Sequence, residues 1–261
     1  MHRKRYKLTL EYDGSRYRGW QQQPNARTIQ GVLITALRTA TGDQTATCVG
    51  AGRTDAGVHA LGQVAHADLV TELDPPSLCA AINDHLPSDI HVLEILPVSH
   101  TFHARHSAVA RSYLYQIALR RGAFIKDYAW WVSEPLNVVR MRSAGELLEG
   151  SHDFQSFAKP APEIRSTRVL LEEIRIERIE QLLLVRLTAS HFLWHMARII
   201  TGVLVQIGMG RLDEQTLVEY LERFSPKPLS FIAPASGLYL ERVYYRGESR
   251  VGELVPTIHL R

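Results

Sequence analysis

The segment AGRTDAGVHA, residues 51–60, brings one carboxylate and one guanidinium together in a glycine-rich stretch. The carboxylate belongs to Asp55 and the guanidinium to Arg53. The glycines around them are Gly50, Gly52 and Gly57. Glycine tolerates backbone conformations and close contacts that a Cβ atom forbids. The segment has no second acid and no serine–histidine or cysteine–histidine pair, so it favours chemistry that uses a single carboxylate.

Two interpretations of Asp55 are open at this point. An aspartate in a glycine-rich loop is often a turn former whose side chain bonds to nearby amides. Alternatively, charge pairing with Arg53 or other cations favours the ionised carboxylate. An ionised acid suits a nucleophile or a base better than a proton donor.

Histidines suggest a second kind of site. His100, His103 and His106 recur at every third position, and His59 and His66 flank the strand after the Asp55 loop. No acid lies close to the run, and there is no HExxH pattern of the kind that holds zinc. Exposed or hydrogen-bonded histidines are therefore the preferred interpretation.

The composition is that of an ordinary globular protein. The chain has 261 residues, 45% of them hydrophobic, and a net charge of +3. No apolar run approaches the roughly 18 residues of a membrane span, so we expect a cytoplasmic protein without a membrane segment. Cys48 and Cys79 form no CxxC pair and are expected to stay reduced. The glycines Gly202, Gly208 and Gly210 form neither GxGxxG nor a P-loop, so no nucleotide cofactor is expected.

Arginines recur beside aromatic residues at three places: 16–20, 111–115 and 244–246. Arginine suits planar contacts with phosphate and stacking, and aromatic side chains provide platforms for unstacked bases. The pattern is compatible with RNA binding, although an arginine-rich solvated surface explains it as well.

In the first part of the chain, apolar periodicity and helix caps predict a β-α-β-β-α-β order. The predicted elements are a strand at 6–12, a helix from the N-cap Thr28 to Gly42, strands at 46–49 and 62–69, a helix after the N-cap Asp74, and a strand at 90–96. The second part gives the same order less regularly. Its predicted elements are a strand at 111–119, a helix at 138–148, a hairpin of 169–176 with 182–187, helices at 193–207 and 213–223, and a strand at 239–245. Residues 120–136 and 159–168 are expected to be loops.

These orders predict an α+β fold of two ferredoxin-like (β-α-β-β-α-β) halves. The halves would share one mixed, mainly antiparallel sheet with a central cleft. We expect an N-terminal subdomain at 1–105 and a C-terminal subdomain at 106–261. The reaction itself does not follow from these residues.

The segment GRTDAGVHALGQVAHAD strongly resembles the signature of the bacterial tRNA pseudouridine synthase A (TruA) family. Further segments resemble the family in the same order along the chain: EYDGSRYRGWQQQPNARTIQGVL, LPSDIHV with TFHARHSAVARSYLY, GSHDFQSFA, HFLWHMARIITGVLVQIGMG and ASGLYLERVYY. The resemblance covers nearly the whole chain.

The resemblance implies an isomerase that needs no cofactor and no metal. Such an enzyme converts uridine to pseudouridine at positions 38, 39 and 40 of the tRNA anticodon stem-loop. It also implies a homodimer with a basic cleft for tRNA. The target uridine has to leave its stack before the chemistry.

The family's functional residues match positions of this sequence. Asp55 matches the nucleophilic aspartate, and Arg53 matches the neighbouring arginine that helps to flip or hold the nucleotide. Tyr113 matches the tyrosine that contacts the target base, and Arg198 matches the arginine that pairs with the aspartate. Leu238, or alternatively Leu240, would form the apolar wall of the pocket. The N-terminal subdomain would thus carry the aspartate loop, and the C-terminal subdomain the tyrosine and the pairing arginine. The glycines near Asp55 would leave room for an extruded nucleotide.

The sequence departs from the family pattern at three positions, and none removes a functional group. Ala197 stands where valine is common, Ser15 where threonine is common, and His106 where a hydrophobic residue is usual. These three differences concern the shape of the pocket. Two rival functions are a non-catalytic RNA-binding or chaperone protein on the same scaffold and a histidine–metal hydrolase. The joint presence of Asp55, Tyr113 and Arg198 argues against the first.

Overall fold

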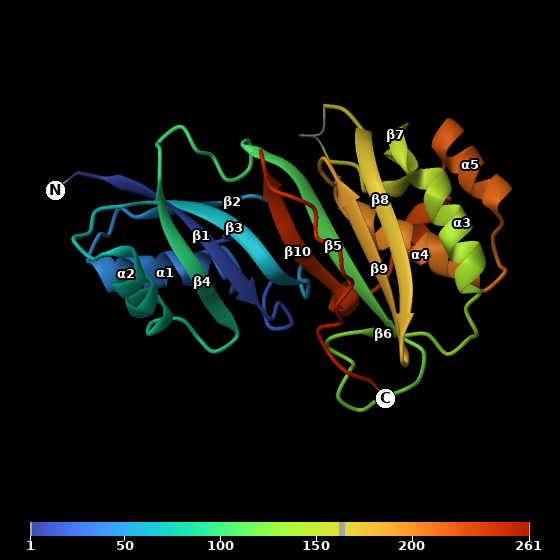
Figure 1. Cartoon of the computed structure of the whole chain (residues 1–261), viewed down its shortest axis with the longest axis horizontal. Helices are drawn as coiled ribbons and strands as arrows, with labels where there is room; N and C mark the ends of the chain where they lie inside the picture. The colour runs from blue at the N-terminus through green and yellow to red at the C-terminus, as the bar shows by residue number, and fades with distance from the viewer. Residues whose placement is uncertain (1, 162–164, 261) are drawn as a thin grey trace. The chain divides into compact units, whose positions relative to one another are not determined.

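The structure is a computed structural model that describes residues 2–161 and 165–260. The chain forms two compact units, shown in Figure 1. The first consists of Met1–Val109 with Tyr239–Ser249, and the second of Ala110–Leu238 with Arg250–Arg261. The predicted division after residue 105 falls close to the end of the first segment. The return of a strand from the far end of the chain to the first unit was not predicted.

The sheet of the first unit is built around β1 (Lys4–Tyr12). This strand runs antiparallel to β3 (His59–Leu69) on one side and to β4 (Ile90–Val98) on the other. The second half of β3 pairs with β2 (Thr47–Gly50) in antiparallel fashion. The start of β3 pairs in parallel with β10 (Leu238–Tyr245). The loop between β2 and β3 includes Asp55. One end of this loop is held by the pairing of β2 with β3, and the other end runs directly into β3.

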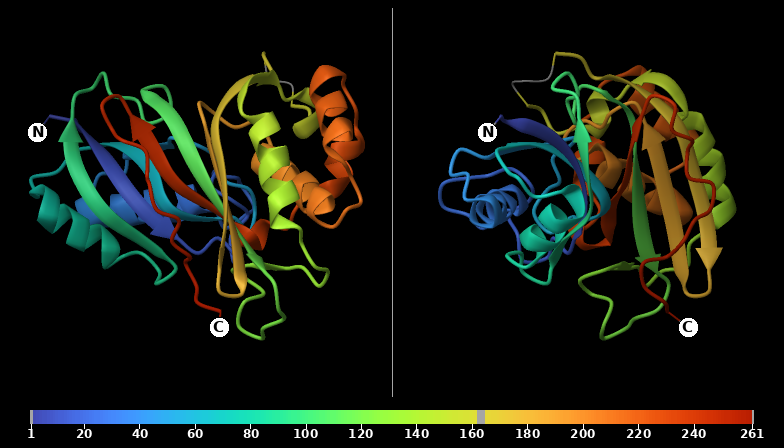
Figure 2. Two further views of the ribbon diagram at one scale, coloured as in Figure 1. Left: turned by 45° about the vertical axis from the view of Figure 1, so that its right-hand side comes forward. Right: turned by 60° about the vertical axis from the view of Figure 1, so that its left-hand side comes forward.

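Two helices, α1 (Ile29–Thr41) and α2 (Pro75–Asn83), lie side by side on one face of this sheet (Figure 2). Their caps are those predicted. The side chain of Thr28 accepts from the N–H of Gly31, and that of Asp74 accepts from the N–H of Ser77. The helix α1 ends at Gly42, whose φ of 72° is the left-handed conformation that glycine adopts most readily.

The core of the first unit lies between these helices and the sheet. Leu8 and Leu10 of β1 and Leu33 and Leu37 of α1 are fully buried. Burial of each such side chain contributes about 1.5–3 kcal/mol to the free energy of unfolding. The alternation of β1 and the helical periodicity of α1 explain why these residues face one another.

The second unit contains the antiparallel strand order β5-β9-β8-β7. The bounds of its strands are β5 (Ala108–Ala118), β6 (Trp130–Trp131), β7 (Gly150–Asp153), β8 (Arg168–Ile179) and β9 (Leu182–Ala189). Its helices are α3 (Val138–Leu148), α4 (Met196–Gly208) and α5 (Glu214–Glu222), with short 3-10 turns η1 (Gln155–Phe157), η2 (Lys227–Phe231) and η3 (Ala235–Gly237). The helices lie on one side of the β8–β9 hairpin (Figure 2).

The last residues of the chain pack onto this sheet through buried polar side chains. The guanidinium of Arg186 in β9 donates to the main-chain carbonyls of Val251 and Glu253. The amide of Gln116 in β5 donates to the hydroxyl of Thr257 and accepts from its N–H. Every residue of β9, which lies between β5 and β8, is buried.

The predicted α+β class is confirmed, and each predicted helix and strand is present with small shifts at its ends. The strand predicted at 62–69 begins earlier, at His59, and β6 lies inside the predicted loop at 120–136. Of the predicted loop at 159–168, residues 162–164 lie outside the described residues. The strand predicted to close the second half forms as β10 and belongs to the first unit, since strand pairing depends on tertiary context that a local pattern does not encode. The shared sheet and the cleft stay predictions.

Among residues 2–161 and 165–260, none of the helices has the length and the apolar content that crossing a membrane requires.

Candidate active site

Asp55 lies half-buried at the first position of a turn between β2 and β3. The N–H of Val58 donates to the carbonyl of Asp55 at 3.1 Å and closes the turn. Gly57 has a φ of 78°, the value of the third residue of a type II turn. Its N–H donates to the carbonyl of Tyr17 at 3.4 Å. A side chain at position 57 would be strained, so this glycine sets the direction in which the chain leaves Asp55.

The segment 13–20 lies directly against this turn. The N–H of Trp20 donates to the carbonyl of Thr54 at 3.0 Å. A Cβ atom at Gly19 would lie 2.5 Å from that same carbonyl oxygen, and one at Gly14 would lie 1.9 Å from the carbonyl oxygen of Val58. Both glycines are therefore needed for the two stretches of main chain to touch.

Buried polar side chains contact the residues just before Asp55. The hydroxyls of Tyr12 and Thr54 are 2.8 Å apart, and the amide nitrogen of Gln63 donates to the carbonyl of Gly52 at 3.1 Å. Burial raises the pKa of Tyr12 well above its usual range, so its hydroxyl stays protonated. The other end of the Gln63 amide, Oε1, is buried with no hydrogen-bond partner, a cost of about 1–3 kcal/mol. Sequence analysis did not identify this cluster.

The glycines near Asp55 serve different purposes. A Cβ atom at Gly50 would lie 2.6 Å from the indole ring of Trp20, so packing inside the protein requires that glycine. Gly57 is required by its positive φ. At Gly52 a Cβ atom would meet nothing within 4 Å. Gly52 thus faces open space.

Arg53 is exposed beside this turn. Its Nε donates to the side-chain oxygen of Gln21 at 3.1 Å. The Gln21 amide in turn donates to Gln30, a buried residue of α1, at 2.8 Å. Arg16 and Arg18 are exposed on the segment 13–20 as well. Three exposed arginines therefore lie on the Asp55 loop or on the segment that touches it, and arginine suits contacts with phosphate.

Tyr113, Arg198 and Leu238 belong to the second unit. Tyr113 is a buried residue of β5, and its ring meets the ring of Phe192 edge to face, with centroids 4.8 Å apart. Such a pair adds about 0.5–1.5 kcal/mol beyond the area it buries. The orientation of the Tyr113 ring is thus supported by a neighbour that sequence analysis did not identify.

Arg198 lies in the first turn of α4 and is fixed to the segment that precedes η3. Its Nε donates to the carbonyl of Ala233 at 2.7 Å, and the N–H of Ala233 donates to the carbonyl of Arg198 at 3.1 Å. A Cβ atom at Gly202 would lie 1.6 Å from the carbonyl oxygen of Phe231, so helix and segment are in direct contact. Leu238 follows this segment and is buried.

The structure thus brings Asp55 and Arg53 onto one loop of the first unit. In the second unit Tyr113 comes from β5, Arg198 from α4, and Leu238 from the start of β10. The predicted pairing of Arg198 with Asp55 stays a prediction.

Three of the histidines, His66, His103 and His106, lie close together. The ring centroids of His66 and His103 are 4.7 Å apart, and those of His103 and His106 are 4.3 Å apart. Nδ1 of His66 accepts from the N–H of Ala104, and burial lowers the pKa of His66 to about 4. Within 2–161 and 165–260, no group of three or more histidine, cysteine, aspartate or glutamate residues is placed to hold a metal ion.

Comparison with known proteins identifies the family. The model of the family described as tRNA pseudouridine synthase matches residues 9–107 and 144–246. The first range contains Asp55 and Arg53, the second contains Arg198 and Leu238, and Tyr113 lies between them.

Curated relatives match this chain over almost its whole length and theirs. The tRNA pseudouridine synthase A of Thermoanaerobacter sp. (strain X514) is 38% identical over 240 residues, which cover 91% of this chain and 98% of that protein. The protein of the same name from Bartonella tribocorum is 40% identical, with 92% and 99% covered, and that from Beijerinckia indica subsp. indica is 41% identical, with 94% and 95% covered. Fold and matches together define an RNA-modifying isomerase of mixed α+β architecture. The chain belongs to the tRNA pseudouridine synthase family.

Proposed function

We propose that this enzyme converts uridine to pseudouridine at positions 38, 39 and 40 of the tRNA anticodon stem-loop, with Asp55 as the nucleophile. The observation that carries the proposal is the turn at Asp55, which lies in a range matched by the family. Groups from β1, β3 and the segment 13–20 fix the main chain around this carboxylate. A reactive group held by its neighbours on a rigid scaffold is what catalysis requires.

The reaction rearranges bonds within one nucleotide. The N1–C1′ bond breaks, the uracil rotates, and a C5–C1′ bond forms. C5 loses its proton and N1 gains one, so nothing is oxidised and no co-substrate is consumed. The carboxylate of Asp55 adds to the nucleoside and is released in the same turnover. A uridine within a stem has to be extruded before any of these steps.

The remaining groups would bind and orient the extruded nucleotide. In this proposal Tyr113 contacts the target base and Arg53 holds the flipped nucleotide. Arg198 pairs with the Asp55 carboxylate, and Leu238 forms the apolar wall of the pocket. The edge-to-face support of the Tyr113 ring and the exposed position of Arg53 favour these roles.

We further propose that the enzyme acts as a homodimer in the cytoplasm. Cys48 and Cys79 are free thiols, in keeping with a reducing compartment. The dimer rests on the resemblance of the chain to its family. Light scattering is expected to give a mass near twice the 29.5 kDa of the chain. The mass of a single chain would contradict the dimer.

Tritium release from tRNA labelled at C5 of uridine tests the reaction, because C5 gives up its hydrogen only when the C5–C1′ bond forms. The protein is expected to release tritium from tRNA with uridine at position 38, 39 or 40. The matched control is the same tRNA with cytidine at all three positions, which is expected to release none. A non-catalytic RNA-binding protein on this scaffold would bind both tRNAs and release no tritium, which would contradict the proposal.

A further inference from the structure

The buried polar cluster under the Asp55 turn consists of Tyr12 in β1, Gln63 in β3 and Thr54 in the turn itself. Their exposed fractions are 4%, 0% and 6%. Tyr12 and Gln63 are 51 residues apart in the sequence and come from adjacent strands. The cluster is therefore built by the sheet and is independent of the local sequence of the turn.

Hydrogen bonds connect the cluster to the residues just before Asp55. The amide nitrogen of Gln63 is only a donor, and it donates to the carbonyl of Gly52 at 3.1 Å and to the hydroxyl of Tyr12 at 3.4 Å. The Tyr12 hydroxyl accepts there and also shares a hydrogen bond with the Thr54 hydroxyl, 2.8 Å away. The cluster thus reaches residues 52 and 54, on both sides of Arg53 and next to Asp55.

Stability alone does not explain why a residue with an amide group stands at the buried position 63. Its Oε1 is buried without a hydrogen-bond partner, whereas most buried polar atoms in proteins have one. An apolar residue of similar size would avoid that penalty in a strand whose neighbours, Val64 and Ala65, are also buried. What an apolar residue would lose is the donor end, which holds the Gly52 carbonyl and the Tyr12 hydroxyl.

We propose that Gln63 and Tyr12 are positioning residues that set the place of the Asp55 carboxylate by fixing the carbonyl of Gly52 and the side chain of Thr54. The proposal rests on the proposed role of Asp55 as nucleophile. Neither side chain touches the substrate. A misplacement of about 1 Å at a reacting group lowers turnover by roughly 100-fold, so loss of either anchor affects kcat and not the binding of tRNA.

The first test removes each anchor. Gln63→Leu and Tyr12→Phe are expected to lower kcat for tritium release about 10- to 100-fold, with KM for tRNA little changed and with the protein still folded at the assay temperature despite a lower Tm. The matched control is Tyr245→Phe, which removes another buried tyrosine bond of the same unit, from the Tyr245 hydroxyl to the carbonyl of Ala104. That variant is expected to keep the kcat of the wild type.

A second variant supplies a readout that a purely structural role would not move. In Gln63→Glu the protonated acid still donates to the carbonyl of Gly52, and the ionised acid does not. Burial raises the pKa of a carboxyl group, so kcat should approach the wild-type value at low pH and fall as pH rises through that pKa. Circular dichroism over the same pH range is the control that checks whether the variant stays folded.

The outcomes separate this proposal from the one on which it rests. If Asp55→Asn keeps wild-type turnover, the proposed function itself fails. If Asp55→Asn is inactive while Gln63→Leu, Gln63→Glu and Tyr12→Phe all turn over like the wild type, only the positioning role is overturned. A loss of kcat that follows the loss of folded protein, or a change confined to KM, overturns it too.

Discussion

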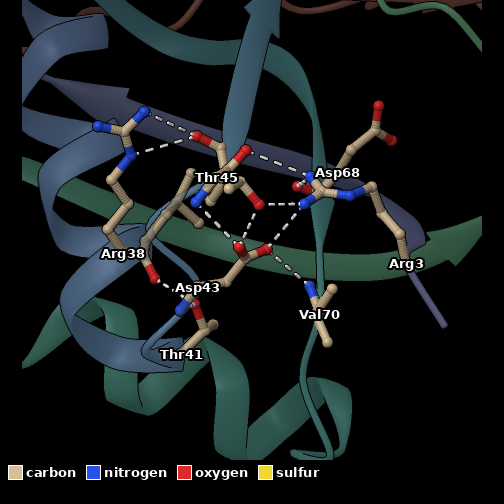
Figure 3. Close-up of polar contacts among 9 residues, drawn as sticks. Arg3, Arg38, Thr41, Asp43, Thr45, Asp68 and Val70 are labelled. Carbon is tan, nitrogen blue, oxygen red and sulfur yellow. Dashed lines mark hydrogen bonds and ion pairs between the residues drawn. The ribbon is translucent and has the colours of Figure 1, made fainter. Parts of the chain in front are cut away.

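Two aspartates in turns of the first unit, Asp43 and Asp55, differ in what holds each turn in place. At Asp43, between α1 and β2, the carboxylate itself is the anchor (Figure 3). One oxygen accepts from the N–H and the hydroxyl of Thr45, and the other accepts from the N–H of Val70 and from Arg3. The Thr45 hydroxyl, more than any other group, lowers the pKa of Asp43.

At Asp55 other residues supply several anchors of the turn. The N–H of Trp20 holds the carbonyl of Thr54, the hydroxyl of Tyr12 holds the Thr54 side chain, and Gly57 supplies the positive φ. Both aspartates stand in turns rich in small residues, so residue type and context do not distinguish them. The carboxylate of Asp43 holds its own turn, whereas the role proposed for Asp55 is chemical.

The largest expected effect is that of Asp55→Asn. The amide keeps the shape of the side chain but is not a nucleophile, so kcat for tritium release should fall by roughly 10⁴-fold or more. Because other residues hold the turn, Tm and the affinity for tRNA should stay close to those of the wild type. Filter binding and thermal unfolding of the same preparation measure both. A fall in Tm with little change in kcat would reverse the assignment of the two aspartates.

The same comparison applies to two tyrosines of β5, Tyr113 and Tyr115. The Tyr115 hydroxyl donates to the carbonyl of Pro234 at 2.8 Å, which is a structural contact. Tyr113→Phe should lower kcat about 100-fold if its hydroxyl takes part in proton transfer, with a smaller change in tRNA affinity. Tyr115→Phe is the control and should lower Tm while kcat stays the same. An unchanged rate for Tyr113→Phe would show that the hydroxyl takes no part in the chemistry and that the ring only packs against the base.

Asp43→Asn should act on stability, with activity retained below Tm. Replacing one carboxylate oxygen by an amide sets donors against Val70 and Arg3, so the free energy of unfolding should drop by about 1–3 kcal/mol near pH 7. Since the folded pKa of Asp43 lies below the ordinary 3.8, its contribution is present above that value and is lost as pH falls through the folded pKa. Urea unfolding at successive pH values should therefore show the wild type and Asp43→Asn converging in acid. A gap that stays constant down to about pH 2 would show that the charge of Asp43 does not stabilise the fold.

Sequence patterns predicted the elements around both aspartates because the signals are local. Thr28 and Asp74 cap helices through bonds that span three residues, and alternation identified β1. Asp55 was identified through a resemblance, since composition alone left a turn former equally open. The anchors Tyr12 and Gln63 escaped prediction because they meet across adjacent strands, and only the register of β1 against β3 brings them together.

The smallest expected effect concerns the one glycine of the Asp55 segment that neither packing nor φ explains. A methyl group at Gly52 meets no atom within 4 Å, so Gly52→Ala should change the free energy of unfolding by less than about 0.5 kcal/mol. Gly50→Ala, whose methyl would press on Trp20, is the matched control and should cost about 1–3 kcal/mol. If the space at Gly52 receives the extruded nucleotide, Gly52→Ala should raise KM for tRNA a few-fold while Tm is unchanged. Equal KM values for Gly52→Ala and the wild type would show that the nucleotide does not occupy this space, and the carboxylate would then have to be approached from another side of the turn.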